Sequence, residues 1–559
     1  MRIVVLILTL VSTSTTQNHP DPLILEKLEE EGLNVTELIE IREQLDEVKD
    51  QAEAEIILTP EQEAELQEKL KDVDNITQDK TEDGGEAIED ANDETGVSQI
   101  LYQGDIVLTK PQAAEIVEEI KHSGTEGTED TQDVRKKRQA YRDKWYPITV
   151  WSKGVNYYFQ PSATHGTRSI FLKAMELWRS QTCIEFYENP YAEDRIGVFK
   201  GAGCWSHIGR TGTEQSLSLG ERCENLRNAA HEIGHSLGLF HTQSRHDRDS
   251  YITFNAHNVQ HGWVSEYNKE TEETNYNYGL AYDYGSIMHY GAHSSSRNTL
   301  PTMIPRDTKY LETLGSAIIS FNDLYMINKH YNCTAKCDPS KSAKCKRGGY
   351  PHPRNCAKCI CPGGYGGDLC DKRPDDGCGK VLQATTSYQY FQAEVGDRQA
   401  GRKARVDFTT CTYWIKASKG SRVEVNIKEL DVGHVGDGCQ FGGVEIKSQQ
   451  DQRLTGYRYC APKDNRVTLV STHNIVPVII FNRFYVTKVT IQYREIPGGQ
   501  VNPTTRRPKP PTTTVRPKPS ECVDSERCKL LMQLRDFCRR PTISTPFKRA
   551  HCGKSCNLC

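Results

Sequence analysis

The chain has 559 residues and a formal net charge of −5. That length exceeds what one hydrophobic core usually organises, so several domains are expected. Basic residues are scattered apart from a few short clusters, which argues against a nucleic-acid partner.

The first residues predict a secretory signal peptide over 1–16. Arg2 precedes an apolar run from Ile3 to Val11, and small polar residues follow the run. The run is too short to span a membrane, and the sequence contains no stretch of about 18 apolar residues. We therefore expect a secreted, extracellular protein with no membrane span.

Cysteine usage agrees with an oxidising compartment. All 20 cysteines lie between Cys183 and Cys559, and their number is even, which indicates a disulfide framework. Sequons, which are typical of a secreted glycoprotein, occur at Asn34, Asn75 and Asn332.

Residues 17–138 are acidic and free of cysteine, and we interpret them as a propeptide. A helix is expected around "TPEQEAELQEKLKD", and a disordered charged stretch is expected in "QDKTEDGGEAIEDANDETG". The segment ends in the basic cluster "RKKR", so a furin-like processing protease is expected to cleave after Arg138. A solvated charge cluster is the alternative interpretation.

Residues 139–333 have a globular composition with mixed periodicity. Alternating aromatic and β-branched residues in "YPITVWSKGVNYYF" predict strands, and "RSIFLKAMELWRSQT" has helical spacing. This mixture predicts an α+β domain.

Four smaller regions follow. Residues 337–370 hold six cysteines in a Gly-rich stretch that only bridges could stabilise; a zinc ribbon is the rival, which the C-x-C pair and secretion disfavour. Alternating runs over 378–494 predict a β-sandwich. Residues 497–520 are rich in Pro and Thr and predict an extended linker, and residues 522–559 hold the last six cysteines.

The stretch "HEIGHSLGLFH", from His231 to His241, predicts a metal site. A helical stripe with Asn225 as a possible N-cap places His231 and His235 one turn apart on one face. Gly238 can adopt a positive φ that reverses the chain and returns His241 as a third ligand.

Three imidazole ligands leave one position of a zinc ion open for water. Glu232 lies beside the site, where it can accept a proton from that water and pass it to a leaving amine, which is the chemistry of peptide hydrolysis. The five-residue H-E-x-x-H pattern often arises by chance, whereas the full eleven-residue form is far more specific.

The zinc motif is followed by "RHDRDSYI" and then by "YGSIMHYG". Together these stretches resemble the astacin metalloproteases, a metzincin family. The resemblance implies a zincin-like fold, one Zn²⁺, an apolar floor made by Met288 in the Met-turn, and an oxyanion-stabilising role for Tyr290. Taken alone, Met288 would be plain core and Tyr290 a half-buried aromatic.

Three further assignments depend on the same resemblance. The "YQGDIVL" stretch offers Tyr102 and Asp105 for the family's F-x-G-D propeptide motif, whose aspartate binds the zinc; an ordinary Gly-Asp turn is the alternative. Arg297 matches an arginine of the S1′ pocket in tolloid-like relatives, or is an ordinary surface arginine. Thr242 departs from the family, which has a glutamate there that binds the freed N-terminus; here that terminus would be Gln139, which can cyclise and lose its charge.

The later regions resemble known modules, namely an EGF-like module at 337–370, a CUB module at 378–494 and an ShKT module at 522–559. Their order is similar to that of nematode astacins. The resemblance implies the disulfides Cys183–Cys333, Cys204–Cys223, Cys337–Cys356, Cys345–Cys359, Cys361–Cys370, Cys378–Cys411, Cys439–Cys460, Cys522–Cys559, Cys528–Cys552 and Cys538–Cys556.

The sequence thus predicts a secreted, latent zinc metalloendopeptidase that acts on extracellular proteins, for example of matrix or cuticle. A catalytically silent, matrix-binding scaffold is the alternative. A channel-blocking role for the ShKT module is disfavoured, because the Lys-Tyr pair typical of such blockers is not evident.

Overall fold

The computed structural model describes residues 21–71, 87–122, 138–142, 145–271, 275–498, 524–525, 528–532, 537–540 and 543–558. We divide them into an N-terminal segment (21–122), a central domain (138–336), a cysteine-rich segment (337–376), a β-sandwich (377–498) and a C-terminal segment (524–558). The predicted signal peptide, Asn75, nearly all of the linker and the Cys522–Cys559 pair lie outside the described residues.

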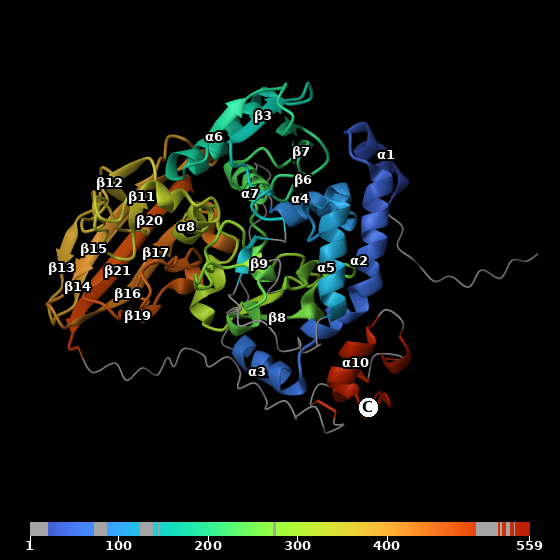
Figure 1. Ribbon diagram of the computed structural model, residues 1–559. Helices are drawn as coiled ribbons and strands as arrows, with labels where there is room; N and C mark the ends of the chain where they lie inside the picture. Colours follow the sequence, from blue (N-terminus) through green and yellow to red (C-terminus); the bar gives the residue numbers. More distant parts are fainter. Residues whose placement is uncertain are drawn as a thin grey trace, which may run out of the picture.

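The central domain lies between the N-terminal segment and the β-sandwich (Figure 1). Its main sheet has the order β1-β6-β7-β5-β3-β4, and all its pairs are parallel except β6 with β7. The strands are β1 (Ile106–Val107), β3 (Val155–Phe159), β4 (Phe186–Glu188), β5 (Arg195–Phe199), β6 (Cys204–His207) and β7 (Glu214–Leu219). Since β1 comes from the N-terminal segment, that segment extends the sheet of the central domain by one edge strand.

Two helices of the central domain, α6 (His165–Gln181) and α7 (Leu226–Ser236), pack against each other and share a buried core with this sheet. Both have polar N-caps, because the Thr164 and Asn225 side chains accept backbone N–H groups of their first turns. The helix predicted from "RSIFLKAMELWRSQT" is therefore confirmed as part of α6. The remaining elements are β2 (Arg138–Tyr141), β8 (Ile252–Phe254), β9 (Asn275–Tyr276), β10 (Met303–Pro305) and α8 (Phe321–His330).

The strand prediction for "YPITVWSKGVNYYF" is right only for its last five residues, which form β3. The preceding residues form successive turns, in which Ile148 N–H donates to Trp145 and Gly154 N–H donates to Trp151. Trp151 is 2% exposed and its indole N–H donates to the Ser236 carbonyl, 2.9 Å away. The aromatic residues there anchor turns to the end of α7 and do not line a sheet face.

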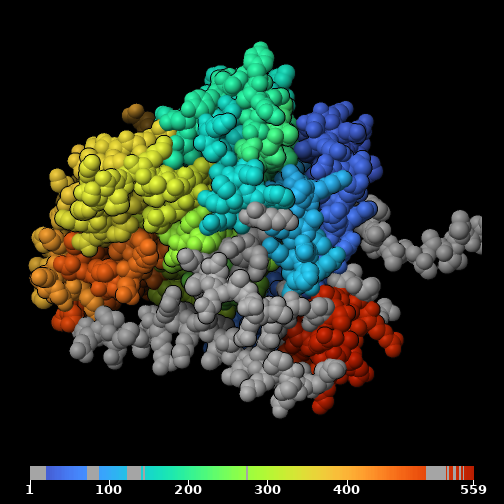
Figure 2. All heavy atoms as spheres, in the orientation of Figure 1, coloured from blue at the N-terminus to red at the C-terminus, as the bar shows by residue number. Residues whose placement is uncertain are grey.

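The N-terminal segment is mainly helical and packs along one side of the central domain (Figure 2). Its helices are α1 (Pro22–Glu30), α2 (Val35–Ile56), α3 (Pro60–Lys71), α4 (Ile88–Thr95) and α5 (Lys110–His122). The helix predicted around "TPEQEAELQEKLKD" is confirmed as α3.

The predicted disorder of "QDKTEDGGEAIEDANDETG" is wrong where the structure describes that stretch. Residues 88–95 form α4, which Gly96 ends with φ +77. Asn92 is fully buried, and its amide donates to the Gly104 and Cys204 carbonyls while its oxygen accepts the Cys204 N–H. Contacts with β6 thus order a stretch whose composition alone favours disorder.

The β-sandwich predicted from alternating runs is present. One sheet has the order β13-β15-β20-β17-β18 and the other the order β14-β21-β16-β19. Alternate residues of facing strands are fully buried, such as Val423 and Val425 on β16 and Val476 and Val478 on β20. The strands are β13 (Val381–Gln383), β14 (Gln389–Gly396), β15 (Ala404–Lys416), β16 (Arg422–Asp431), β17 (Gly442–Ile446), β18 (Tyr457–Tyr459), β19 (Thr468–Val470), β20 (Ile475–Phe484) and β21 (Val486–Ile496).

Disulfides cross-link the two smaller parts of the chain. The cysteine-rich segment has one hairpin, β11 (Tyr350–His352) with β12 (Asn355–Ile360), and the C-terminal segment has α9 (Cys528–Leu531) and α10 (Thr545–Cys552). The C-terminal segment contacts the N-terminal one, where Arg540 Nη1 lies 2.8 Å from Asp50 Oδ1. Within the described residues, no helix combines the length and apolar character that a membrane crossing requires.

Candidate metal centre

Helix α7 carries the first two histidines of the zinc motif on one face. Its N-terminus is capped by Asn225, and the chain reverses at Gly238, which has φ +98, so both predictions about the ends of this helix are confirmed. The reversal brings His241 back beside His231 and His235, whose rings lie 5.1 Å and 4.7 Å from the His241 ring.

In each of the three imidazoles, the Nδ1 atom lies within hydrogen-bond distance of an oxygen on the side away from the other two rings. Nδ1 of His231 lies 2.8 Å from the Ile287 carbonyl, and Nδ1 of His235 lies 2.7 Å from the Leu239 carbonyl. Nδ1 of His241 lies 2.9 Å from Oε1 of Gln103. Oxygen acceptors at Nδ1 select the tautomer that leaves Nε2 with a free lone pair.

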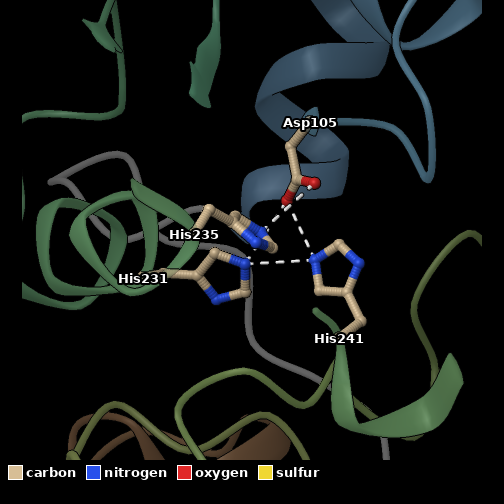
Figure 3. Close-up of side chains that lie close together, drawn as sticks. All are labelled: Asp105, His231, His235 and His241. Atoms are coloured by element: carbon tan, nitrogen blue, oxygen red, sulfur yellow. Dashed lines mark hydrogen bonds and ion pairs between the residues drawn. The ribbon is translucent and has the colours of Figure 1, made fainter. Parts of the chain in front are cut away.

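The three Nε2 atoms converge with the carboxylate of Asp105, which enters from the N-terminal segment (Figure 3). The Nε2 atoms of His231 and His241 are 3.1 Å apart, and Asp105 oxygens lie 3.2 Å from His241, 3.4 Å from His231 and 3.5 Å from His235. Two ligands in a tetrahedral zinc shell with bonds near 2.0–2.1 Å are about 3.3 Å apart. The four side chains therefore fit Zn²⁺.

Further observations support this fit. Among the described residues, Nε2 of His235 and Oδ1 of Asp105 are buried without a hydrogen-bond partner, which is costly unless a metal ion binds there. Burial lowers the pKa of His231 to about 3 and also lowers that of His241, so these rings are neutral near pH 7, as metal ligation requires.

Glu232 follows His231 on α7, and its side chain is fully buried. Neither of its carboxylate oxygens has a hydrogen-bond partner within the described part of the chain. Burial, with a contribution from the nearby Asp105 carboxylate, raises the pKa of Glu232 well above its usual value. Glu232 is not one of the four converging groups, which agrees with a position beside the ligands.

Met288 and Tyr290 both lie against the histidine cluster. Met288 is fully buried, and a Cβ on Gly234 of α7 would come within 2.6 Å of its sulfur, so this helical glycine makes room for the Met-turn. The Tyr290 ring lies 4.5 Å from the His241 ring, and its hydroxyl donates to the Gln103 carbonyl at 2.6 Å.

The loop that carries Asp105 is tightly closed. Tyr102 and Ile106 exchange two backbone hydrogen bonds of 2.9 Å, and the loop between them needs φ +50 at Gln103 and +85 at Gly104. A Cβ on Gly104 would come within 3.0 Å of the Trp263 ring, so glycine is required there for space as well as conformation.

Gln103 and Glu270 are functional candidates that the sequence reasoning missed. Glu270 is buried and accepts hydrogen bonds from the Tyr102 hydroxyl at 2.8 Å and from Nε2 of Gln103 at 2.7 Å. Gln103 lies inside the "YQGDIVL" stretch, so its neighbourhood to Asp105 could have identified it as a candidate. The residues around Glu270 contain no motif that points to a functional role.

Three of the remaining positions singled out in the sequence are Arg297, Thr242 and Arg138, and none of the three is among the four converging groups. Arg297 is exposed, and its Nε donates to the His257 carbonyl at 2.7 Å. Thr242 is buried and donates to Ser286, and Ser286 donates to Asp323 on α8. The structure describes the backbone of Arg138 in β2, but not its side chain.

Asn332 and Asn34 are both exposed, and Asn34 caps α2. The structure forms the disulfides Cys183–Cys333, Cys204–Cys223, Cys337–Cys356, Cys345–Cys359, Cys361–Cys370, Cys378–Cys411, Cys439–Cys460, Cys528–Cys552 and Cys538–Cys556.

Comparison with known proteins agrees with this geometry. The sequence model of the Astacin peptidase family matches residues 143–332. Zinc metalloproteinase nas-31 of Caenorhabditis elegans is 43% identical over 500 residues, which are 89% of this chain and 77% of the relative. Zinc metalloproteinase nas-32 of the same organism is 37% identical over 411 residues, which are 73% of this chain and 60% of that relative.

Among solved structures, High choriolytic enzyme 1, a hatching enzyme zinc-protease of the medaka fish Oryzias latipes, is 28% identical with a TM-score of 0.31 and covers 37% of this chain and 99% of its own. The extent and identity of the match to nas-31, at a site built for one catalytic zinc ion, show that the chain belongs to the astacin family and is a zinc metalloendopeptidase.

Proposed function

We propose that the protein is secreted as a latent precursor and, once processed, hydrolyses peptide bonds in extracellular proteins such as those of matrix or cuticle. In this proposal His231, His235 and His241 hold the catalytic zinc ion. The observation that carries the proposal is the convergence of their three Nε2 atoms with the carboxylate of Asp105.

A zinc ion bound there supplies a Lewis acid that polarises a carbonyl and makes bound water more acidic. The protein's own share of the proton chemistry falls to Glu232, which accepts a proton from the attacking water and delivers it to the leaving amine. Its buried carboxylate oxygens, which lack hydrogen-bond partners in the described part of the chain, support this role.

Tyr290 donates its hydroxyl hydrogen bond to the oxyanion that develops on the substrate carbonyl. Its ring contacts His241, and its hydroxyl is engaged by the Gln103 carbonyl in the latent form. Met288 forms the apolar floor under the ligands, which its burial against Gly234 supports.

Residues 17–138 act as the propeptide, and Asp105 takes the zinc position that water needs. A furin-like protease cleaves after Arg138 and so separates this segment covalently from the protease domain, 139–333. The signal sequence at 1–16, the disulfides and the sequons at Asn34, Asn75 and Asn332 support export and glycosylation.

The later modules are EGF-like (337–370), CUB (378–494) and, after the linker 497–520, ShKT (522–559), closed by Cys522–Cys559. They dock the enzyme to its substrates or to the matrix. Arg297 would favour acidic residues on the leaving side of the cleaved bond, which its exposed position permits.

A catalytically silent scaffold is the second candidate. It is favoured by Thr242, which replaces the glutamate that usually receives the new N-terminus and instead donates its hydroxyl to Ser286.

The deciding experiment uses the full precursor, cleaved after Arg138 and assayed on a peptide with and without a chelator, beside Glu232→Ala. Metal-dependent hydrolysis that is lost in Glu232→Ala supports the proposal. Processed material that contains zinc but is inactive supports the scaffold, and activity that survives the loss of Glu232 refutes the mechanism.

A further inference from the structure

We propose that the β-sandwich is a fixed part of the catalytic unit and that its Asp437 is a positioning residue for the chain segment that follows Tyr290. This inference rests on the proposed role of Tyr290 in stabilising the oxyanion. It gives the sandwich a task in the reaction itself, beyond any docking role.

Asp437 holds one residue of the central domain with both oxygens of its carboxylate. Oδ2 accepts the backbone N–H of His293 at 2.7 Å, and Oδ1 lies 2.9 Å from Nδ1 of the same residue. The two side chains are only 15% and 9% exposed. A partly buried, two-point contact of this kind restrains both the backbone and the ring of its partner.

His293 lies three residues after Tyr290, and hydrogen bonds also hold the chain on either side of it. Tyr290 N–H donates to Oε1 of Gln243 at 3.1 Å, and the Ser294 carbonyl accepts the Tyr267 hydroxyl at 2.9 Å. The Tyr267 ring in turn meets the Tyr290 ring edge-on at 6.2 Å. Asp437 therefore holds His293 within the short stretch 290–294, whose first residue is Tyr290 and whose last residue binds the tyrosine that packs against the Tyr290 ring.

The contact is too close for the sandwich to move independently. A Cβ added to Gly291 would overlap the Asp437 side chain, and one added to Gly438 would overlap the Gly315 backbone. Gly438 has φ +69 and Gly315 has φ +88, conformations that favour glycine. At Gly438 and Gly315 the two modules thus approach backbone to backbone, and at Gly291 the Asp437 side chain packs directly against the backbone.

Aromatic packing and buried polar pairs extend the same interface. Tyr310 of the central domain lies between Tyr284, on which it stacks at 4.2 Å, and Tyr457 of the sandwich, whose ring is tilted against it at 4.4 Å. Arg458 of the sandwich is buried; its guanidinium donates across the interface to Ser316 of the central domain at 2.7 Å and is paired within the sandwich with Glu445 at 3.0 Å. Since buried polar groups of this kind are costly to separate, the interface resembles a permanent contact.

The test uses the processed full-length enzyme and a fluorogenic peptide. Asp437→Ala should lower kcat roughly 10- to 100-fold, because displacement of a transition-state group by about 1 Å has that effect, while KM and the zinc content stay unchanged. Asp437→Asn should lose less, since its amide oxygen still accepts the His293 N–H. Asp397→Ala, an exposed position of the same sandwich, is the matched control and should be unchanged.

A double-mutant cycle tests whether the effect of Asp437 on kcat depends on Tyr290. If Asp437 acts by placing Tyr290, Asp437→Ala causes no further loss of kcat in a Tyr290→Phe background. Additive losses, or a folded Asp437→Ala or Asp437→Asn enzyme with full kcat, would overturn the inference. Tyr290→Phe alone tests the proposed function separately, because its full activity would refute the oxyanion role whatever Asp437 does. Thermal melting identifies a variant that fails to fold, in which case the Asp437→Asn enzyme decides.

Discussion

Gln103 binds the third zinc-facing imidazole from behind, with its Oε1 atom 2.9 Å from Nδ1 of His241. Two residues later, Asp105 faces the Nε2 side of the same ring at 3.2 Å. The N-terminal segment therefore grips His241 at both nitrogens, and through Nε2 of Gln103 it also reaches Glu270. We propose that these two contacts form a clamp around His241 and that the latency of the precursor depends on the clamp as well as on the position of the Asp105 carboxylate.

The clamp predicts that Gln103→Leu raises the basal activity of the uncleaved precursor. The substitution leaves buried Nδ1 of His241 without its Gln103 partner and removes one of the two hydrogen bonds to Glu270, which costs about 1–3 kcal/mol. Basal hydrolysis should rise roughly 5- to 100-fold in an Arg138→Ala background that prevents processing. Gln99→Leu, an exposed glutamine on the same segment, is the control, and equal activities of the two variants would contradict the clamp.

Asp105→Ala should also activate the uncleaved precursor. It removes the carboxylate that meets the three Nε2 atoms, so the fourth zinc position opens to water while the helices of the segment stay docked. The loss of one charge-assisted contact predicts a rise of roughly 10- to 100-fold in hydrolysis, measured in the Arg138→Ala background. Glu26→Ala on α1 is an exposed control. A precursor that remains silent without Asp105 would remove the switch assignment.

Latency should weaken as the pH rises. Burial, with a further contribution from Glu119, raises the pKa of Glu270 from 4.5 to about 8 where the N-terminal segment packs against it. A carboxyl whose pKa is higher when the segment is docked takes up a proton on docking, so docking is strongest below about pH 4.5 and weakens up to about pH 8.

The measurement is the ratio of precursor activity to processed-enzyme activity, which cancels the pH dependence of catalysis itself. The ratio should increase from about pH 5.5 to about pH 8. In the Glu270→Gln variant the ratio should change little over this range, because the titrating carboxyl is absent. A ratio that falls with rising pH would show that Glu270 does not control docking.

Tyr290→Phe should lower kcat of the processed enzyme roughly 100-fold, because one hydrogen bond to the developing oxyanion is lost. KM and the bound zinc should change little, since the three histidines are untouched. The same substitution removes the hydroxyl that donates to the Gln103 carbonyl, so the Tyr290→Phe precursor should release its cleaved N-terminal segment faster. Metal analysis and size-exclusion chromatography after cleavage provide the readouts, and an unchanged kcat would exclude the oxyanion role.

Local patterns predicted the elements whose stability is mainly local. Asn225 and Gly238 define the ends of α7 because a polar N-cap and a positive φ are properties of single residues. Among the alternating runs of 378–494, residues 421–430 ("SRVEVNIKEL") match β16, since one face of that strand is buried in the sandwich.

Predictions failed where distant contacts outweigh local composition. Residues 88–95 have the acidic composition of a disordered stretch, yet α4 forms because Asn92 binds the Cys204 backbone, 112 residues away. The aromatic alternation before β3 marks anchored turns, because the indole of Trp151 finds its acceptor on Ser236 at the end of α7.

The sequence by itself determined the helix that carries His231 and His235 and the return of His241, because these depend on spacing within a few turns of chain. The same motif, together with the Met-turn stretch that follows it, indicated the family. Only the tertiary structure decided that Gln103 joins His241 to Glu270 and that Asp437 of the β-sandwich contacts His293 in the segment after Tyr290. Those partners lie more than a hundred residues apart, and their pairing depends on which surfaces the fold buries together.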